Sequence, residues 1–184
     1  MTALAAFVDA MTALVSRTQH EPTLLAEGRA HLAALLADET WLPASHAQPR
    51  PDRYAQYPLH RDAHGRFSVV SFVWGPGQRT PVHNHTVWGL VGVLRGAELC
   101  DEYRLQGAHP VAAGRCHTMQ RGQIEAVSPT VGDWHRVSNA LADRASISIH
   151  VYGGDIGEVR RQRLDEQGRV LDFVSGYDTP AVAD

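Results

Sequence analysis

Short segments rich in β-branched and aromatic residues dominate the chain from about residue 67 onward. They are RFSVVSFVW, VWGLVGVLRG, ELCDEYRL, IEAVSP, HRVSNA, ASISIHVYGG and RVLDFVSG, and Gly, Pro, Asn or Asp residues separate them. Several short strands at near-regular spacing are typical of an antiparallel β-sandwich or barrel. No alternation of strands and helices accompanies them, which disfavours a parallel α/β sheet. The pattern therefore predicts a mainly β fold.

The N-terminal residues follow a helical pattern instead. Apolar residues recur there at three- and four-residue spacing, at Leu4, Phe7, Val8, Met11, Leu14 and Val15. This spacing predicts a helix over residues 2–16, and an Ala- and Leu-rich stretch predicts a second helix over residues 22–37. A loop rich in Pro and polar residues follows, and the terminal YDTPAVAD is expected to be a frayed tail.

Composition limits the chemistry that the chain can perform. The net charge of −3 in 184 residues gives no reason to expect a nucleic-acid partner. All 17 basic residues are arginine, which excludes a Schiff-base lysine and a phosphate-loop lysine. Cys100 and Cys116 lack the spacing of a redox pair and are expected to be ordinary thiols. Because the N-terminus has no basic region and Asp9 interrupts its apolar run, we expect a cytoplasmic protein without a membrane span.

Two histidines separated by one residue, His83 and His85, are the strongest indication of chemistry. Alternate residues of a strand point to the same face, and imidazole is the commonest protein ligand of metals. His135, at the expected start of a later strand, is the third candidate ligand. Three neutral histidines with open positions suit Fe(II) or Zn(II), so the ligands alone leave the metal open.

The positions around these histidines resemble the two conserved motifs of the cupin barrel. The matching residues are Gly77, His83, His85 and Gly96 in the first motif and Gly132, His135 and Asn139 in the second. The resemblance implies a double-stranded β-helix (jelly-roll) barrel with an α-helical N-terminal subdomain. It implies one cupin domain over residues 1–184, with helices in 1–45 and the barrel in 60–175. Where cupins carry a glutamate ligand, this chain has Gly89 followed by Leu90.

A second pattern, Ser148, His150 and Tyr152, occupies alternate positions of a predicted strand. If this face is buried, the three side chains need hydrogen-bond partners, which a chain from Ser through His to Tyr would supply. The other interpretation is a strand with one polar face toward solvent. Alternation alone is compatible with both.

The combined motifs resemble the thiol dioxygenases, the cysteine dioxygenase family of cupins, over about residues 50–160. They are HxHT without the glutamate, a later His followed by VSN, and SxHxY. Trp74 lies nine residues before His83; we interpret it, and Trp134, as core residues. The resemblance implies one Fe(II) per chain, bound by His83, His85 and His135. It further implies that both atoms of O2 are added to a small thiol carboxylate, giving a sulfinate, with Ser148, His150 and Tyr152 as catalytic residues.

Gln56 bears on the substrate. Mammalian-type cysteine dioxygenases carry a carboxylate-binding arginine at the corresponding place, whereas Gln56 resembles the bacterial 3-mercaptopropionate dioxygenases. In that group an arginine beyond SxHxY takes over the carboxylate, and spacing favours Arg161 for this role. Arg160, Arg163 and Arg53 are the other candidates, and a solvated arginine run is the alternative interpretation.

Leu90 corresponds to the cysteine that mammalian-type enzymes crosslink to the tyrosine, so an unmodified Tyr152 is predicted. L-Cysteine or another thiol acid such as mercaptosuccinate is an alternative substrate. A cupin that binds a metal or small ligand without turnover is an alternative function, and a zinc hydrolase is a weaker one. No membrane partner is expected, and a homo-oligomer stays open.

Overall fold

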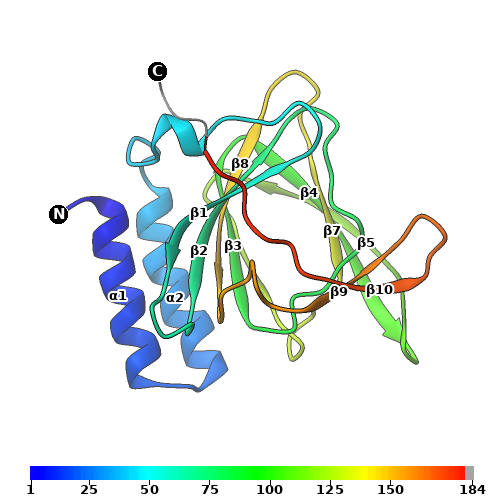
Figure 1. Ribbon diagram of the computed structural model, residues 1–184, viewed down its shortest axis with the longest axis horizontal. Helices are drawn as coiled ribbons and strands as arrows, with labels where there is room; N and C mark the ends of the chain where they lie inside the picture. Colours follow the sequence, from blue (N-terminus) through cyan, green and yellow to red (C-terminus); the bar gives the residue numbers. More distant parts are fainter. Residues whose placement is uncertain (181–184) are drawn as a thin grey trace.

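Two antiparallel β-sheets form most of the molecule in the computed structural model, which describes residues 1–180 (Figure 1). One sheet has the strand order β1-β2-β8-β3-β6, the other β5-β4-β7, and β9 and β10 form a hairpin. The strands are β1 (Ala55–Arg61), β2 (Ser68–Trp74), β3 (Gly89–Arg95), β4 (Ala97–Gln106), β5 (His109–Gln120), β6 (Ile124–Val127), β7 (His135–Asn139), β8 (Ser146–Tyr152), β9 (Arg161–Leu164) and β10 (Val170–Phe173). The prediction of a mainly β fold is confirmed.

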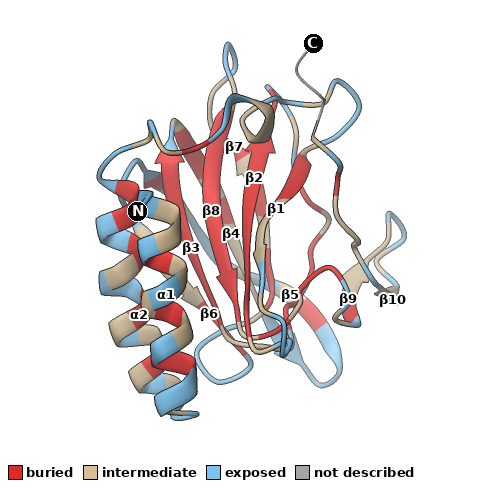
Figure 2. Ribbon diagram, turned by 60° about the vertical axis from the view of Figure 1, so that its left-hand side comes forward, coloured by how far each residue is buried: buried red, intermediate tan, exposed pale blue. Residues whose placement is uncertain are grey.

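Two helices, α1 (Ala3–Arg17) and α2 (Glu21–Leu36), lie beside the five-stranded sheet (Figures 1 and 2). Both begin and end within one residue of the predicted limits. Helix α2 packs on β3 at Gly92, where an added Cβ would lie 3.1 Å from Leu32 Cδ2 and closer still to Leu36 Cδ1. The missing side chain therefore lets the helix approach the sheet closely.

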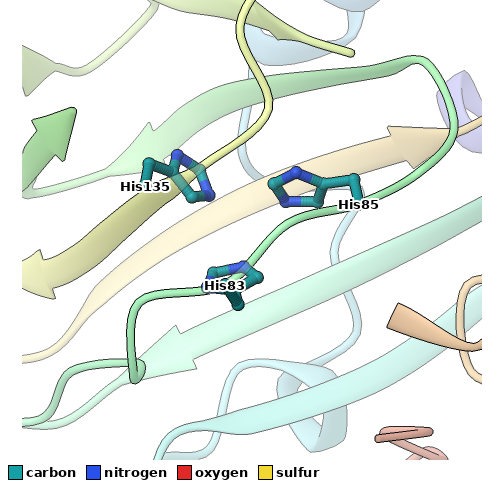
Figure 3. Close-up of side chains that lie close together, drawn as sticks. All are labelled: His83, His85 and His135. Atoms are coloured by element: carbon teal, nitrogen blue, oxygen red, sulfur yellow. The ribbon is translucent and has the colours of Figure 1, made fainter. Parts of the chain in front are cut away.

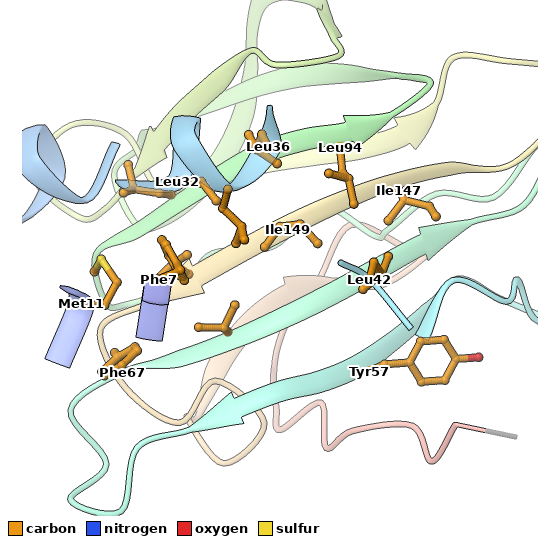
Figure 4. Packing of buried hydrophobic residues seen from close by; sticks show 14 of the residues in the cluster. Phe7, Met11, Leu32, Leu36, Leu42, Tyr57, Phe67, Leu94, Ile147 and Ile149 are labelled. Carbon is orange, nitrogen blue, oxygen red and sulfur yellow. The ribbon is translucent and has the colours of Figure 1, made fainter. Parts of the chain in front are cut away.

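Strand β8 is buried along its whole length. Ile147, Ile149 and Val151 belong to the core cluster that also contains residues of both helices (Figure 4). Because side chains alternate along a strand, Ser148, His150 and Tyr152 point the other way, into the space between the sheets. The interpretation of a polar face toward solvent is thereby excluded.

Three strands, β1, β5 and β9, were not predicted from the sequence pattern. Strand β1 contains Pro58 and shifts register between Pro58 and His60, which an edge strand tolerates because one side of it needs no hydrogen-bond donors. Strand β5 is also an edge strand, and its Ala and Gly residues carry little β propensity. Strand β9 contains Arg161 and Arg163 of the arginine run. The strands thus begin at Ala55, earlier than residue 60.

The expectation of a frayed C-terminal tail is wrong for its first residues. The Tyr177 hydroxyl hydrogen-bonds to Asp155, and the buried Asp178 accepts a hydrogen bond of 2.9 Å from the Gln56 backbone N–H. The remainder of that expectation, residues 181–184, lies outside the described residues. Within residues 1–180, no helix combines the length and apolar character needed to cross a membrane.

Candidate metal centre

The structure brings His83, His85 and His135 together (Figure 3). One ring nitrogen of each lies within 4.8 Å of those of the other two, and all three residues are buried. The ring centroids are 4.8–4.9 Å apart. Three imidazoles at this separation can share one metal ion.

The backbone that carries His83 and His85 is not the regular strand that the sequence predicts. His83 makes an isolated bridge to His135, with N···O distances of 3.0 and 3.1 Å, and His85 lies in an irregular segment before β3. Thr86 has a left-handed φ of 61°, which turns the chain directly after the second histidine. The two imidazoles converge because this bridge and turn aim them at His135, rather than through strand alternation.

Hydrogen bonds at Nδ1 leave the Nε2 atoms of these histidines free. His83 Nδ1 lies 3.1 Å from the Pro81 carbonyl, and His85 Nδ1 lies 3.1 Å from the Asp133 carboxylate. Because these oxygens only accept, each Nδ1 is the donor and each Nε2 carries a lone pair. His85 Nε2 is buried without any hydrogen-bond partner among the described residues. A metal ion would satisfy this orphaned atom, so the residues fit a metal centre.

Burial keeps the three rings neutral. It is the main reason that the pKa of His83, His85 and His135 lies below the ordinary value, and it acts most strongly on His83 and His135. Metal ligation requires the neutral form of imidazole. At neutral pH the three imidazoles are therefore in the protonation state that metal binding requires.

Asp133 supports the centre and was not singled out in the sequence. Its carboxylate accepts hydrogen bonds from the backbone N–H groups of His85 and Thr86, at 2.8 and 3.1 Å, as well as from the His85 ring. It thus fixes both the loop and the orientation of one imidazole. Its position, two residues before the candidate ligand His135, was the one sequence feature that could have indicated this role.

Ser148, His150 and Tyr152 form a continuous buried hydrogen-bond chain. The Tyr152 hydroxyl lies 2.7 Å from His150 Nδ1, and His150 Nε2 lies 2.8 Å from Ser148 Oγ. Trp74 Nε1 donates to the same Oγ at 3.2 Å. The Tyr152 ring stacks on His85 with centroids 5.4 Å apart, which places the end of the chain at the metal centre. Burial lowers the pKa of His150 and raises that of Tyr152, so both stay neutral.

A carboxyl group lies at the other end of this chain. Glu98 is fully buried on β4, and its Oε1 accepts from Ser146 Oγ at 3.5 Å. Burial raises the pKa of Glu98 to about 8, although Ser148 and Ser146 oppose the shift. A neutral Glu98 carries a proton beside Ser148 at pH 7. The sequence shows Glu98 only as one polar residue in a strand, with no sign of what it faces.

One cavity of about 440 Å³ unites the candidate site residues. Its walls include His83, His135, Tyr152, Gln56 and Arg161, and Trp74 also contributes. Trp134 lies elsewhere, on a separate cavity. Tyr152 and two of the three metal-site histidines, His83 and His135, thus face a space large enough for a small organic substrate.

Arg161 is buried, with 4% of its surface exposed, so it does not belong to a solvated face. Its Nη2 donates to Ser175 Oγ at 2.7 Å and its guanidinium lies 4.7 Å from the centre of the Phe173 ring, whereas Nε has no partner. Burial lowers the pKa of Arg161, but arginine stays charged in proteins. A buried cation therefore lines the cavity.

The other candidate arginines differ from Arg161 in burial or in partners. Arg160 is exposed, and Arg53 makes hydrogen bonds of 2.5 and 3.0 Å to Asp178. Arg163 is half-buried and lines the cavity. Among these four arginines, Arg161 is the buried one, and its Nε–H group has no hydrogen-bond partner.

Strand β9 reaches the metal centre by pairing with the loop that carries His83. Asn84 N donates to Gln162 O at 3.0 Å, and Gln162 N donates to Asn84 Oδ1 at 2.7 Å. Leu164 N also donates to Val82 O at 2.8 Å. This pairing sets Arg163 opposite His83 and holds β9, which begins at Arg161, along the His83 loop. The sequence spacing could not reveal this placement.

Gln56 lines the cavity, but its amide is committed elsewhere. Its Nε2 donates to the carbonyl oxygens of Ser175 and Gly176 at 3.3 and 3.0 Å. Since Ser175 Oγ holds Arg161, Gln56 fixes the segment against which the arginine rests.

The residue that faces Tyr152 from β3 is Gly89, not Leu90. A Cβ added to Gly89 would lie 2.7 Å from Tyr152 Cδ1, while Leu90 is buried in the core beneath the helices. The sequence spacing matched Leu90 to the crosslinking cysteine, but the position that faces Tyr152 is one residue earlier. Because side chains alternate along a strand, Leu90 points to the opposite face. Glycine at this position leaves Tyr152 without a thiol neighbour on β3.

No family model matches the chain. Similar solved structures include a protein with a double-stranded β-helix domain from Klebsiella pneumoniae, with 17% identity, a TM-score of 0.49, and coverage of 64% of this chain and 93% of that one. A cupin 2 domain-containing protein from Halorhodospira halophila has 17% identity and a TM-score of 0.49, covering 71% and 82%. A cupin-like protein from Thermotoga maritima has 20% identity and a TM-score of 0.46, covering 62% and 80%. At such identities the likeness concerns the fold alone.

Proposed function

We propose that the protein is a non-heme Fe(II) thiol dioxygenase whose preferred substrate is 3-mercaptopropionate. The observation that carries the proposal is the shared cavity, which is lined by neutral metal-site histidines, Tyr152 and the cationic side chain of Arg161. A thiol carboxylate has a thiol that can bind at the metal centre and a carboxylate that can bind to Arg161.

His83, His85 and His135 would hold the iron through their Nε2 atoms. Fe(II) bound there would supply the redox chemistry that allows O2 to react with a thiolate. The overall reaction, RSH + O2 → RSO2⁻ + H⁺, balances without another reductant. Sulfur loses four electrons, O2 gains four, and both oxygen atoms end on sulfur.

The protein residues bind and orient the substrate. Arg161 binds the carboxylate through a charge-assisted hydrogen bond from its guanidinium group. Tyr152 presents its hydroxyl to the sulfur end, because His150 and Ser148 hold it in place from behind. If Ser148 donates to His150 Nε2 and His150 Nδ1–H donates to Tyr152, the Tyr152 proton is free to point into the cavity.

The charges around the cavity favour a substrate without an amino group. Within the described part of the chain, no Asp or Glu lines the cavity, whereas Arg53, Arg161 and Arg163 do. The ammonium of L-cysteine would therefore lack an anionic partner and would lie among cations. The charges lining the cavity thus favour 3-mercaptopropionate over L-cysteine.

Mercaptosuccinate is the second candidate substrate. Its additional carboxylate has an available cation in Arg163, which is half-buried on the same cavity. The same charges that disfavour an ammonium would accept this second anion.

The test is O2 uptake by protein loaded anaerobically with Fe(II), with 3-mercaptopropionate, mercaptosuccinate and L-cysteine at matched concentrations. We expect one O2 per sulfinate and the highest kcat/KM for 3-mercaptopropionate. A preference for L-cysteine would overturn the substrate assignment but keep the dioxygenase. No uptake with any thiol, despite one bound iron per chain, would favour a cupin that binds without turnover.

A further inference from the structure

A second group of metal-binding side chains lies behind His135. The donor atoms of Cys100, His117 and Glu125 lie within 4.8 Å of one another. Cys100 on β4 is directly opposite His117 on β5, and Glu125 comes from β6 of the other sheet. The function proposed above uses none of these three residues.

His117 lies between two carboxylates. It hydrogen-bonds through Nε2 to Glu125, and its Nδ1 is 3.7 Å from Glu102 Oε1. Metal-bound histidines commonly have this arrangement, with one ring nitrogen on the ion and the other held by a carboxylate.

A separate cavity of about 330 Å³ gives access to this group. Cys100, Glu102, Glu125 and His135 line it. Cys100 is buried, whereas His117 and Glu125 are partly exposed. A hydrated ion can therefore reach these donor atoms through the cavity, and the Cys100 thiol is the most buried of the three.

We propose that Cys100, His117 and Glu125 bind a divalent ion of the Zn²⁺ type. One sulfur, one nitrogen and one oxygen donor suit this borderline-soft ion, while Mg²⁺ and Ca²⁺ prefer oxygen alone. Binding releases the Cys100 proton to solvent and moves no electrons. The ion ties β4 and β5 of one sheet to β6 of the other.

This site is independent of the proposed dioxygenase. The His135 ring separates the two groups, because its Nδ1 lies 3.6 Å from Cys100 Sγ, leaving Nε2 for the first centre. One chain thus holds two ions on opposite sides of one imidazole.

Co²⁺ is a suitable probe, because it occupies Zn²⁺ sites and absorbs in the near ultraviolet when a thiolate binds it. The three-histidine centre has no thiolate and cannot produce this absorption. We expect the wild-type chain to bind two Co²⁺ ions and to show the charge-transfer band. The variant His85→Ala, which disables the first centre, should bind one Co²⁺ and keep the band.

The chain offers a matched control in its other thiol. Cys116 is exposed and adjacent to His117, so Cys116→Ser should retain the band and Cys100→Ser should lose it. His117→Gln alters a partly exposed residue, keeps both thiols and should also lose the band, which covers the case that Cys100→Ser does not fold. The proposal is overturned if excess Co²⁺ gives no band in the wild type. It is equally overturned if the band survives in His117→Gln or disappears in Cys116→Ser.

Discussion

The Tyr152 hydroxyl is the clearest single group to remove. It ends a buried hydrogen-bond chain, and the Tyr152 ring stacks on His85. Tyr152 is not among the three residues that could bind the metal. Tyr152→Phe should therefore keep stoichiometric iron but lower kcat by about 10²-fold, as expected for a lost proton or hydrogen-bond donor. Iron analysis and O2 uptake test this together. Unchanged kcat would remove Tyr152 from the reaction.

Arg161→Ala should act on substrate binding. A charge-assisted hydrogen bond contributes about 1.5–3 kcal/mol, so KM for 3-mercaptopropionate should rise roughly 10- to 100-fold with kcat nearly constant. Arg163→Ala is the control, because its half-buried side chain should matter mainly for mercaptosuccinate. The opposite pattern in the two variants would show that the carboxylate binds at Arg163.

Glu98 should make the protein less stable as pH rises. Its pKa is raised from 4.5 to about 8 by burial, so between these values the folded state keeps a proton that the unfolded state releases. The free energy of unfolding then falls by up to about 1.4 kcal/mol per pH unit from this group alone. Glu98→Gln removes this loss, so its stability relative to wild type should improve steadily on going from about pH 5 to about pH 8. Urea unfolding at several pH values measures the difference, and a constant difference would contradict the assignment.

At the level of elements, helix α2 depends on its contact with β3. Leu32 is fully buried against Gly92, and Leu32→Ala should lower the free energy of unfolding by about 2–5 kcal/mol. Leu105→Ala, at a side chain that is 53% exposed, should change it by less than about 0.5 kcal/mol. Denaturant unfolding of both variants is the measurement. Equal effects would mean that the helix does not bury this face.

Hydrophobic and polar periodicity predicted the features that are encoded by residues close together in the sequence. The SxHxY alternation and the position of His135 at the first residue of β7 are of this kind. Glu98 and Cys100 were missed as partners of the site because their roles depend on which strand faces which. Cys100 meets His117 through the register between β4 and β5, whereas Glu98 meets Ser146 of β8 across the space between the two sheets. No spacing within β4 encodes either contact.

At the level of the whole molecule, the metal centre joins segments that are distant in the chain. An ion that binds only the folded state stabilises it by about 4 kcal/mol at 1,000 times its Kd. At roughly 2–4 °C per kcal/mol for a chain of this size, Fe(II) should raise Tm by about 8–16 °C. His83→Ala should abolish most of this shift in an anaerobic thermal melt. A full shift in that variant would place the main metal site elsewhere.

The backbone pairing between the His83 loop and β9 has a thermodynamic consequence. Asn84 and Gln162 exchange hydrogen bonds, so the loop that binds the ion and the strand that carries Arg161 cannot move independently. Occupancy at one end should then alter affinity at the other, and linkage requires the two effects to be equal in size. Propionate, which has the carboxylate but no thiol, should lower the Kd of Fe(II), measured by competition with a chelator at equilibrium. Fe(II) should lower the Kd of propionate by the same factor.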